Sequence, residues 1–121
     1  MSDTLTESVI GAASEVHHHL GPGLLEAIYE EALCIELSLR GIAFQRQAEV
    51  DVNYKSHVIK GMRIDLLVAD ELVVEFKAVA HLPDVAAAQV FSYLKATRLK
   101  RGLPLNFGQA RLVDGIQRIS L

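Results

Sequence analysis

The sequence predicts an α/β (α+β) fold in which helices and strands follow the order α-α-β-β-β-α-β-β. Three observations lead to this order. Apolar residues recur at helical spacing over residues 4–40, run in strand-like patterns over 42–79, and return to helical spacing over 84–100. Because the chain has 121 residues, half of them apolar, and no low-complexity linker, we expect one domain over residues 1–121.

Two helices are expected at the start of the chain. The first covers residues 4–20, whose apolar side chains fall on one stripe, and it ends at the break Gly21-Pro22-Gly23. The second runs from about 24 to 40. Gly41 stands just past its end, where glycine commonly terminates a helix.

Three strands are expected next, over residues 42–54, 57–69 and 71–79, and a third helix follows over 84–100. After it, residues 103–107 have the composition of a short buried strand. The last residues, 110–121, are expected to form a hairpin around an Asp-Gly turn.

Three charged residues lie inside the apolar, strand-like segment: Asp65, Glu75 and Lys77. Burying an isolated charge costs free energy, so these side chains need a metal ion, a charged partner or a water-filled cleft. Two carboxylates and a lysine on one face suit a hard divalent cation and a phosphate, which indicates metal-assisted phosphodiester hydrolysis. The alternative is a hairpin with its charges on a solvated face and Asp65 paired with Arg63 or a helix.

The turn between the two strands decides whether these side chains meet. Side chains alternate faces along a strand, so Glu75 and Lys77 share a face. In an antiparallel pair, the numbers of residues that face each other have a constant sum. Asp65 lies on the same face as Glu75 and Lys77 only if this sum is even, which requires an odd-length loop or a bulge around residues 69–71. A two-residue loop would place Asp65 beside Phe76.

Two polar pairs on the expected helices could reach the strand site. Glu26 and Tyr29 are three residues apart, and Gln89 and Tyr93 are four apart, so each pair shares a helix face. Gln89 and Tyr93 could bind a phosphate or base of a substrate, or could form a buried polar pair. Glu26 in a first turn also favours the positive end of its helix.

Three consecutive histidines occupy positions 17, 18 and 19: His17, His18 and His19. On a helix they point in three directions, so they cannot bind one ion together. His17 lies closest to the apolar stripe. It is therefore the candidate metal ligand of the three, with a core or capping role as the alternative.

The net charge is −3, and basic residues concentrate in the second half of the chain. The cluster Lys95, Arg98, Lys100 and Arg101 could contact the phosphates of a nucleic acid, or could favour the negative end of the third helix. The acidic chain as a whole argues against strong non-specific binding to duplex nucleic acid.

No segment reaches the ~18 uninterrupted apolar residues of a membrane span, and the N-terminus lacks a signal-peptide pattern. We therefore expect a cytoplasmic protein without a membrane partner. The single cysteine, Cys34, is expected to be a buried thiol.

Six short segments between residues 16 and 108 share one known pattern, and the resemblance they carry covers roughly residues 5–120: VHHHLGPG, GLLEAIY, RIDLLV, VEFKAV, AQVFSYL and LNFG. The second contains Gly23, Glu26 and Tyr29. Together they resemble the GxxExxY proteins, small bacterial and archaeal proteins of the PD-(D/E)XK nuclease superfamily.

This resemblance implies a restriction-endonuclease-like core, which is a mixed central β-sheet flanked by helices. It implies a nuclease that uses Mg2+ or Mn2+ and acts on nucleic acid, with DNA as the expected substrate. Asp65 and Glu75 would be metal ligands, and Lys77 would position or activate the attacking water, so these three residues form the expected catalytic set. Glu26 would add a carboxylate to the metal site.

The polar residues of these motifs also look like those of the RecB-type exonuclease branch. The residues that match this branch by type and order are His17, Asp65, Glu75, Lys77, Gln89 and Tyr93. His17 is thus a further expected metal ligand. The expected substrate-binding residues are Gln89, Tyr93, Tyr29, Lys95 and Arg98. In one departure, Ile64 replaces the proline that often precedes the aspartate.

Two other functions fit the same residues. One is a non-catalytic module that binds nucleic acid or protein, and the other is a metal-dependent hydrolase of a phosphodiester outside nucleic acids. Because the chain has no room for a separate DNA-reading domain, a homodimer, a partner or a small structured substrate is expected to supply specificity.

Overall fold

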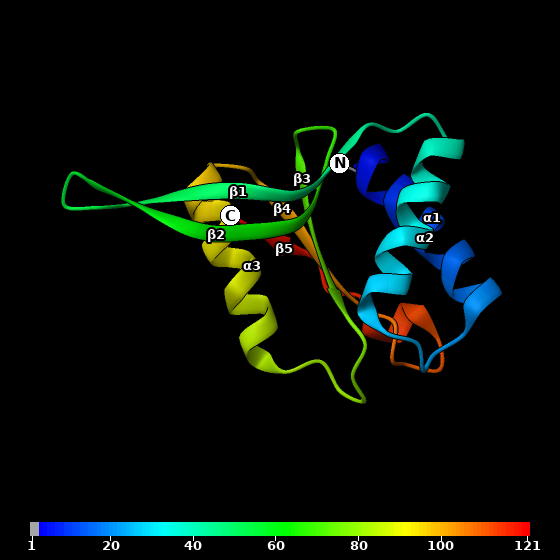
Figure 1. Cartoon of the computed structure of the whole chain (residues 1–121). Helices are drawn as coiled ribbons and strands as arrows, with labels where there is room; N and C mark the ends of the chain where they lie inside the picture. Colours follow the sequence, from blue (N-terminus) through cyan, green and yellow to red (C-terminus); the bar gives the residue numbers. More distant parts are fainter. Residues whose placement is uncertain (1–2) are drawn as a thin grey trace.

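The computed structural model describes residues 3–121 and contains a five-stranded mixed sheet with helices on both faces (Figure 1). The first two residues of the predicted domain lie outside this range. The elements are α1 (Thr4–Leu20), α2 (Glu26–Leu39), β1 (Phe44–Tyr54), β2 (His57–Val68), β3 (Leu72–Lys77), α3 (Asp84–Thr97), β4 (Arg101–Asn106), the 3-10 turn η1 (Leu112–Gly115) and β5 (Ile119–Ser120). The predicted α/β class and the order of helices and strands are confirmed.

The strands lie in the order β1-β2-β3-β4-β5, and only the β3–β4 pair is parallel. A parallel pair needs a crossover connection, and α3 provides it. Figure 1 shows α1 and α2 together on one side of the sheet and α3 on the other. Residues 63–79 therefore run through the middle of the molecule.

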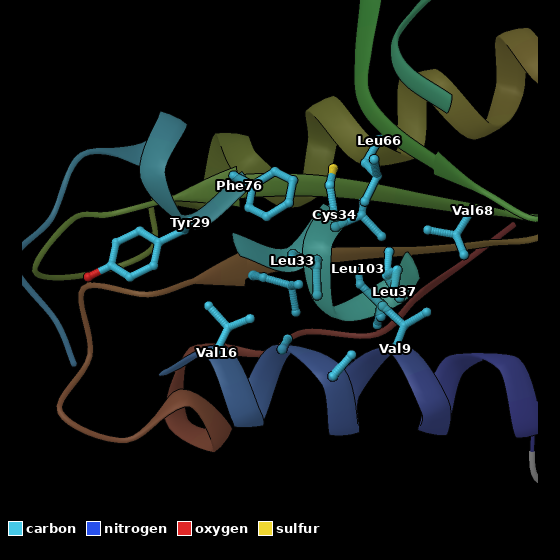
Figure 2. Close-up of a cluster of buried hydrophobic side chains, with 14 of the residues drawn as sticks. Val9, Val16, Tyr29, Leu33, Cys34, Leu37, Leu66, Val68, Phe76 and Leu103 are labelled. Atoms are coloured by element: carbon cyan, nitrogen blue, oxygen red, sulfur yellow. The ribbon is translucent and has the colours of Figure 1, made fainter. Parts of the chain in front are cut away.

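Two apolar clusters hold these layers together. The larger one joins α1 and α2 to the sheet and contains most of the side chains in Figure 2, among them Val9, Tyr29, Leu33, Phe76 and Leu103. The smaller one lies between α3 and the opposite face of the sheet and contains Ala48, Val50, Ile64, Val73, Val90, Tyr93 and Leu94. Phe76 and Val73 thus face opposite layers, as the alternation along β3 predicts.

The β1–β2 hairpin twists strongly at the level of Asp65. Ile64 packs in the cluster under α3, whereas Leu66, two residues later, packs in the cluster under α1 and α2. Residues two apart share a face in a regular strand, so β2 turns over between them. Gln47 on the neighbouring strand has a left-handed φ of 50° at this level. Beyond the twist, the hairpin leaves the sheet and projects past α3 (Figure 1).

The hairpin predicted for residues 110–121 is wrong. Residues Leu112–Gly115 form a 3-10 turn, and β5 pairs instead with the start of β4, through Gly102↔Ile119 and Arg101↔Ser120. The buried side chain of Leu112 anchors the turn in the larger cluster. Gly115 packs so closely that a Cβ there would lie 2.3 Å from the backbone oxygen of Asn106. Tertiary packing therefore overrides the local hairpin pattern.

Within residues 3–121, no helix is both long and apolar enough to cross a membrane.

Candidate active site

Asp65 and Glu75 are brought together by the register of the β2–β3 hairpin. The paired residues Leu67↔Val73 and Leu66↔Val74 have an even sum, and residues 69–71 form a three-residue connection. Ala69 and Asp70 adopt left-handed φ values of 52° and 56°, which allows this short turn. The register therefore meets the condition that the sequence sets for Asp65 to share a face with Glu75.

Both carboxylates bond to backbone groups where the β2–β3 ladder ends. The last ladder pair is Leu66↔Val74. One residue further, the Asp65 N–H donates to Glu75 Oε1 at 3.2 Å, and the Phe76 N–H donates to Asp65 Oδ2 at 3.0 Å. The two side chains thus take over the backbone bonds that would otherwise be lost as β2 turns away from β3.

Burial and the neighbouring Asp65 strongly affect the protonation of Glu75. Glu75 is 4% exposed. Burial first, and then the negative charge of Asp65, raise the pKa of Glu75 to about 7, while the positive charge of Lys77 acts in the opposite direction. A cation placed beside Glu75 would favour its ionised form.

Lys77 is half-buried at the end of β3, and a buried polar clamp follows it. Asn106 is 0% exposed. Its Oδ1 accepts the N–H groups of Val79 and Gly108, both at 3.0 Å, and its Nδ2 donates to the Val79 carbonyl at 2.9 Å. A Cβ on Gly108 would lie 2.2 Å from the Val79 oxygen, so glycine is required there. Asn106 thereby fixes the chain just after Lys77.

The sequence pattern identified Asn106 only as part of the LNFG motif and assigned it no role. A signal was present, since a single asparagine ends the otherwise apolar run LPLNF. A polar side chain in such a run is expected to bond to backbone groups when it is buried.

Gln89 and Tyr93 of α3 lie over the same face of the sheet. The Gln89 Nε2 donates to the Tyr93 hydroxyl at 3.0 Å. Burial raises the pKa of Tyr93, and the negative charges of Glu75 and Asp65 add to this effect. Tyr93 packs in the smaller cluster with Val73, and Val73 and Glu75 share a face of β3, so the Gln89–Tyr93 pair lies on the side of the sheet that carries Glu75.

Tyr29 has a structural position instead of the predicted contact with substrate. It is 0% exposed, and its ring stacks on Phe107 with centroids 4.5 Å apart. Its hydroxyl donates to the Gly21 carbonyl at 2.5 Å and accepts the Leu24 N–H at 3.1 Å. Figure 2 shows this hydroxyl at one end of the cluster, directed towards the loop. Tyr29 therefore closes the turn between α1 and α2.

Gly23 supports the same turn with a φ of 103°, a conformation that favours glycine. Two of the three residues in the GxxExxY motif are thus explained by the turn. Glu26, the third, is exposed in the first turn of α2.

His17 and Glu26 do not join the acidic pair in a common cluster. No group of three or more His, Cys, Asp or Glu side chains in residues 3–121 is arranged to hold a metal ion. His17 is the inward-facing histidine, as predicted, but its Nε2 bonds to the Gln109 carbonyl at 2.8 Å and its ring lies beside Phe107. The observed contacts match the core role considered as the alternative for His17.

The Asp65–Glu75 pair nevertheless suits a divalent cation. Mg2+ prefers oxygen ligands, is commonly bound by one or two carboxylates, and keeps several waters. Glu75 is buried beside the half-buried Asp65, and burial together with the Asp65 charge raises the pKa of Glu75, so a cation bound there would offset like charges. The donor set and its electrostatics therefore fit a metal held by these two side chains.

Lys95 and Arg98 lie away from the acidic pair, in a groove of about 510 Å3 between α3 and the β1–β2 hairpin. Both side chains are exposed. The groove is also lined by Ser92, which precedes Tyr93 in α3, and by Met62, three residues before Asp65 on β2.

Comparison with models of known protein families matches residues 3–119 to the PD-(D/E)XK nuclease superfamily. No curated protein and no solved structure matches the chain. The mixed sheet, the acidic pair on adjacent strands and the lysine two residues after the second acid agree with the family match. The chain therefore belongs to the PD-(D/E)XK nuclease superfamily.

Proposed function

We propose that the protein is a metal-dependent nuclease that hydrolyses phosphodiester bonds of nucleic acid, with DNA as the preferred substrate. The observation that carries the proposal is the convergence of Asp65 and Glu75 where β2 separates from β3, with Lys77 on the same strand face. The six short motifs further favour the GxxExxY group within the superfamily. Homodimer formation stays a prediction.

Asp65 and Glu75 would hold Mg2+ or Mn2+, and we restrict the proposed ligand side chains to these two. When bound, the cation would acidify a water and polarise the scissile phosphate. Asp65 is kept in place by the Phe76 N–H, and Glu75 by the Asp65 N–H, so neither carboxylate needs to reorganise during the reaction.

Lys77 would offset the negative charge that develops on the phosphate oxygens, because its ammonium group lies on the strand face that carries Glu75. The Asn106 clamp limits movement of the chain on which Lys77 stands. Gln89 and Tyr93 would position the substrate from the helix side, where the Tyr93 hydroxyl is held by Gln89.

A non-catalytic module on the same fold would be favoured if Arg63 or apolar side chains filled the acidic site. Arg63 instead bonds to Glu49 on the exposed face of the hairpin at 3.2 Å. This contact leaves the acidic pair without a basic partner from β2 and supports the catalytic proposal over the module. A phosphodiesterase acting outside nucleic acids would use the same ligands and differs only in its substrate.

Calorimetric titration of Mn2+ and Mg2+ into the wild type, Glu75→Gln and Glu71→Gln tests the proposal. Glu71 is an exposed carboxylate in the adjacent turn, so Glu71→Gln is a control for loss of one negative charge. The same samples are then incubated with labelled single-stranded and duplex DNA and RNA. We expect metal binding and cleavage in the wild type and the control, and neither in Glu75→Gln. A wild type that neither binds metal at millimolar concentration nor cuts any substrate would leave the binding module as the better account.

A further inference from the structure

Half of the basic side chains have no carboxylate partner in the part of the chain that the structure describes. Among residues 3–121, half of the 12 Lys and Arg side chains form ion pairs with carboxylates: Arg40, Arg46, Lys60, Arg63, Arg101 and Arg118. The others are Lys55, Lys77, Lys95, Arg98, Lys100 and Arg111. Lys55 is at the tip of the β1–β2 hairpin, Lys77 ends β3, Lys95 and Arg98 are on α3 and its C-cap, Lys100 follows α3, and Arg111 precedes η1.

The groove between the hairpin and α3 contains two of these unpaired cations. It is lined by Asp51, Val52, Asn53, Met62, Ser92, Lys95, Ala96 and Arg98. Its one acidic residue, Asp51, is bonded to Lys60 at 2.7 Å, so it does not neutralise Lys95 or Arg98. The groove thus presents a net positive surface beside polar Asn53 and Ser92.

Arg98 occupies a backbone conformation that favours glycine. It caps the C-terminus of α3 with a left-handed φ of 63°, a position at which glycine is the usual residue. A side chain in this conformation carries a backbone cost. The cost is consistent with a role for the guanidinium in the groove.

The hairpin tip carries the features of a base-stacking element. Tyr54 is 58% exposed, and the Lys55 ammonium lies 5.4 Å from the centre of its ring. Val58 and Ile59 are also exposed on the opposite strand. An exposed aromatic ring beside a cation can stack on an unpaired base while the cation contacts phosphate.

We propose that the groove binds a single strand of nucleic acid, with Lys95 and Arg98 contacting its phosphates and Tyr54 stacking on a base at the hairpin tip. This inference rests on the proposed function in one respect, because it takes the strand to be the nuclease substrate. Met62 precedes Asp65 by three residues, or ~10 Å along a strand, so a bound strand would lead towards the acidic pair. Paired bases would hide the faces that Tyr54 needs, which favours an unpaired strand over a duplex.

Binding can be separated from cleavage by measuring it without metal. Fluorescence anisotropy of labelled oligo-dT, oligo-rU and a duplex of equal length is followed in EDTA over a range of salt concentrations. Four variants are compared with the wild type: Lys95→Ala with Arg98→Ala, Tyr54→Ala, Arg98→Gly, and Arg111→Ala as the control for an unpaired cation outside the groove. Thermal unfolding of each variant checks that it is folded.

The double variant is expected to bind oligo-dT at least 10-fold more weakly and to lower the slope of log affinity against log salt by about 1.4, since each phosphate contact on a single strand contributes about 0.7. Tyr54→Ala is expected to weaken binding about 5- to 100-fold with an unchanged slope, because it removes stacking and no charge. Arg98→Gly should bind more weakly yet unfold at the same or a higher temperature, because glycine suits the left-handed cap. Arg111→Ala should bind like the wild type.

Equal losses in Arg111→Ala and the groove variants would overturn the proposal, as would tighter binding of the duplex. The comparison of oligo-dT with oligo-rU separates DNA from RNA. If the wild type binds through the groove but cuts nothing with Mg2+ or Mn2+, the nuclease proposal fails and the strand-binding groove stands. If the wild type cuts substrate and the groove variants bind oligonucleotides as tightly as the wild type, the strand-binding groove is wrong and the nuclease proposal stands.

Discussion

Asp65 and Glu75 face each other across the point where β2 leaves β3, and a backbone N–H of the opposite strand donates to each carboxylate. The carboxylates satisfy the backbone N–H groups that lose their ladder partners where the two strands separate. The pair is therefore held in place even though the two negative charges repel each other.

Without metal, this arrangement should make the protein less stable at alkaline pH. The pKa of Glu75 is raised from 4.5 to about 7, so the folded state retains a proton that the unfolded state has lost. The resulting stabilisation is complete below about pH 4.5 and disappears as the pH rises through about 7. Glu75→Gln should therefore raise the free energy of unfolding at about pH 8 by about 1–3 kcal/mol, allowing for solvent screening. Urea unfolding in EDTA at about pH 5 and pH 8 measures this, with Glu71→Gln as control. An unchanged or lower stability of Glu75→Gln at pH 8 would contradict the assigned pKa.

Metal binding should counteract the loss of stability of the wild type at alkaline pH. Ligand carboxylates must be deprotonated, so Mn2+ should raise the melting temperature more at about pH 8 than at about pH 6. A free metal concentration of 100 times Kd would stabilise the fold by about 2.7 kcal/mol. Thermal unfolding with and without Mn2+ checks the prediction. Loss of the shift in Glu75→Gln, with retention in Glu71→Gln, would place the ion at the acidic pair, and an equal shift in all three proteins would place it elsewhere.

Lys77→Ala should reduce the turnover number by about 10²–10³-fold, as expected when one group that stabilises transition-state charge is removed. The metal-induced rise in melting temperature should persist, because an ammonium group is not a metal ligand. Steady-state kinetics on the cleaved substrate, together with the melting curves, measures both effects. If Lys77→Ala cleaves normally, the proposed role of the lysine is wrong.

Tyr29→Phe should affect stability without affecting the chemistry. The change removes a hydroxyl that bonds both Gly21 and Leu24, at a cost of about 1–3 kcal/mol in the free energy of unfolding. Cleavage per folded molecule should be unchanged, since this ring is buried under the sheet. Tyr54→Phe, which alters an exposed tyrosine, is the control and should be neutral in stability. A kinetic defect in fully folded Tyr29→Phe would restore the direct substrate contact that the sequence predicted.

Asn106→Ala should destabilise the fold by about 2–4 kcal/mol, because it leaves the N–H groups of Val79 and Gly108 and the Val79 carbonyl without partners. The segment after Lys77 should also exchange its amide hydrogens faster. Chemical denaturation and hydrogen exchange measure the two effects. A substitution that leaves both unchanged would remove Asn106 from the supports of the site.

The sequence by itself determined the secondary structure of most of the chain and the residues of the acidic site. Helical spacing and strand alternation are local consequences of backbone geometry, so α1 and β2 could be predicted nearly to the residue. Charges inside an apolar run indicated Asp65, Glu75 and Lys77, because buried charge requires a specific environment.

Only the tertiary structure decided which of the candidates meet. The three-residue turn fixed the β2–β3 register, and no sequence pattern distinguishes it with certainty from a two-residue turn. Tyr29 and His17 lie in the interior, where they contact Phe107 and Gln109. These partners come from a distant part of the chain, so local sequence does not reveal them. The C-terminal segment formed η1 and paired with β4 for the same reason. Long-range packing competes with local propensity and here prevails, since it buries side chains such as Leu112 that a local hairpin would leave exposed.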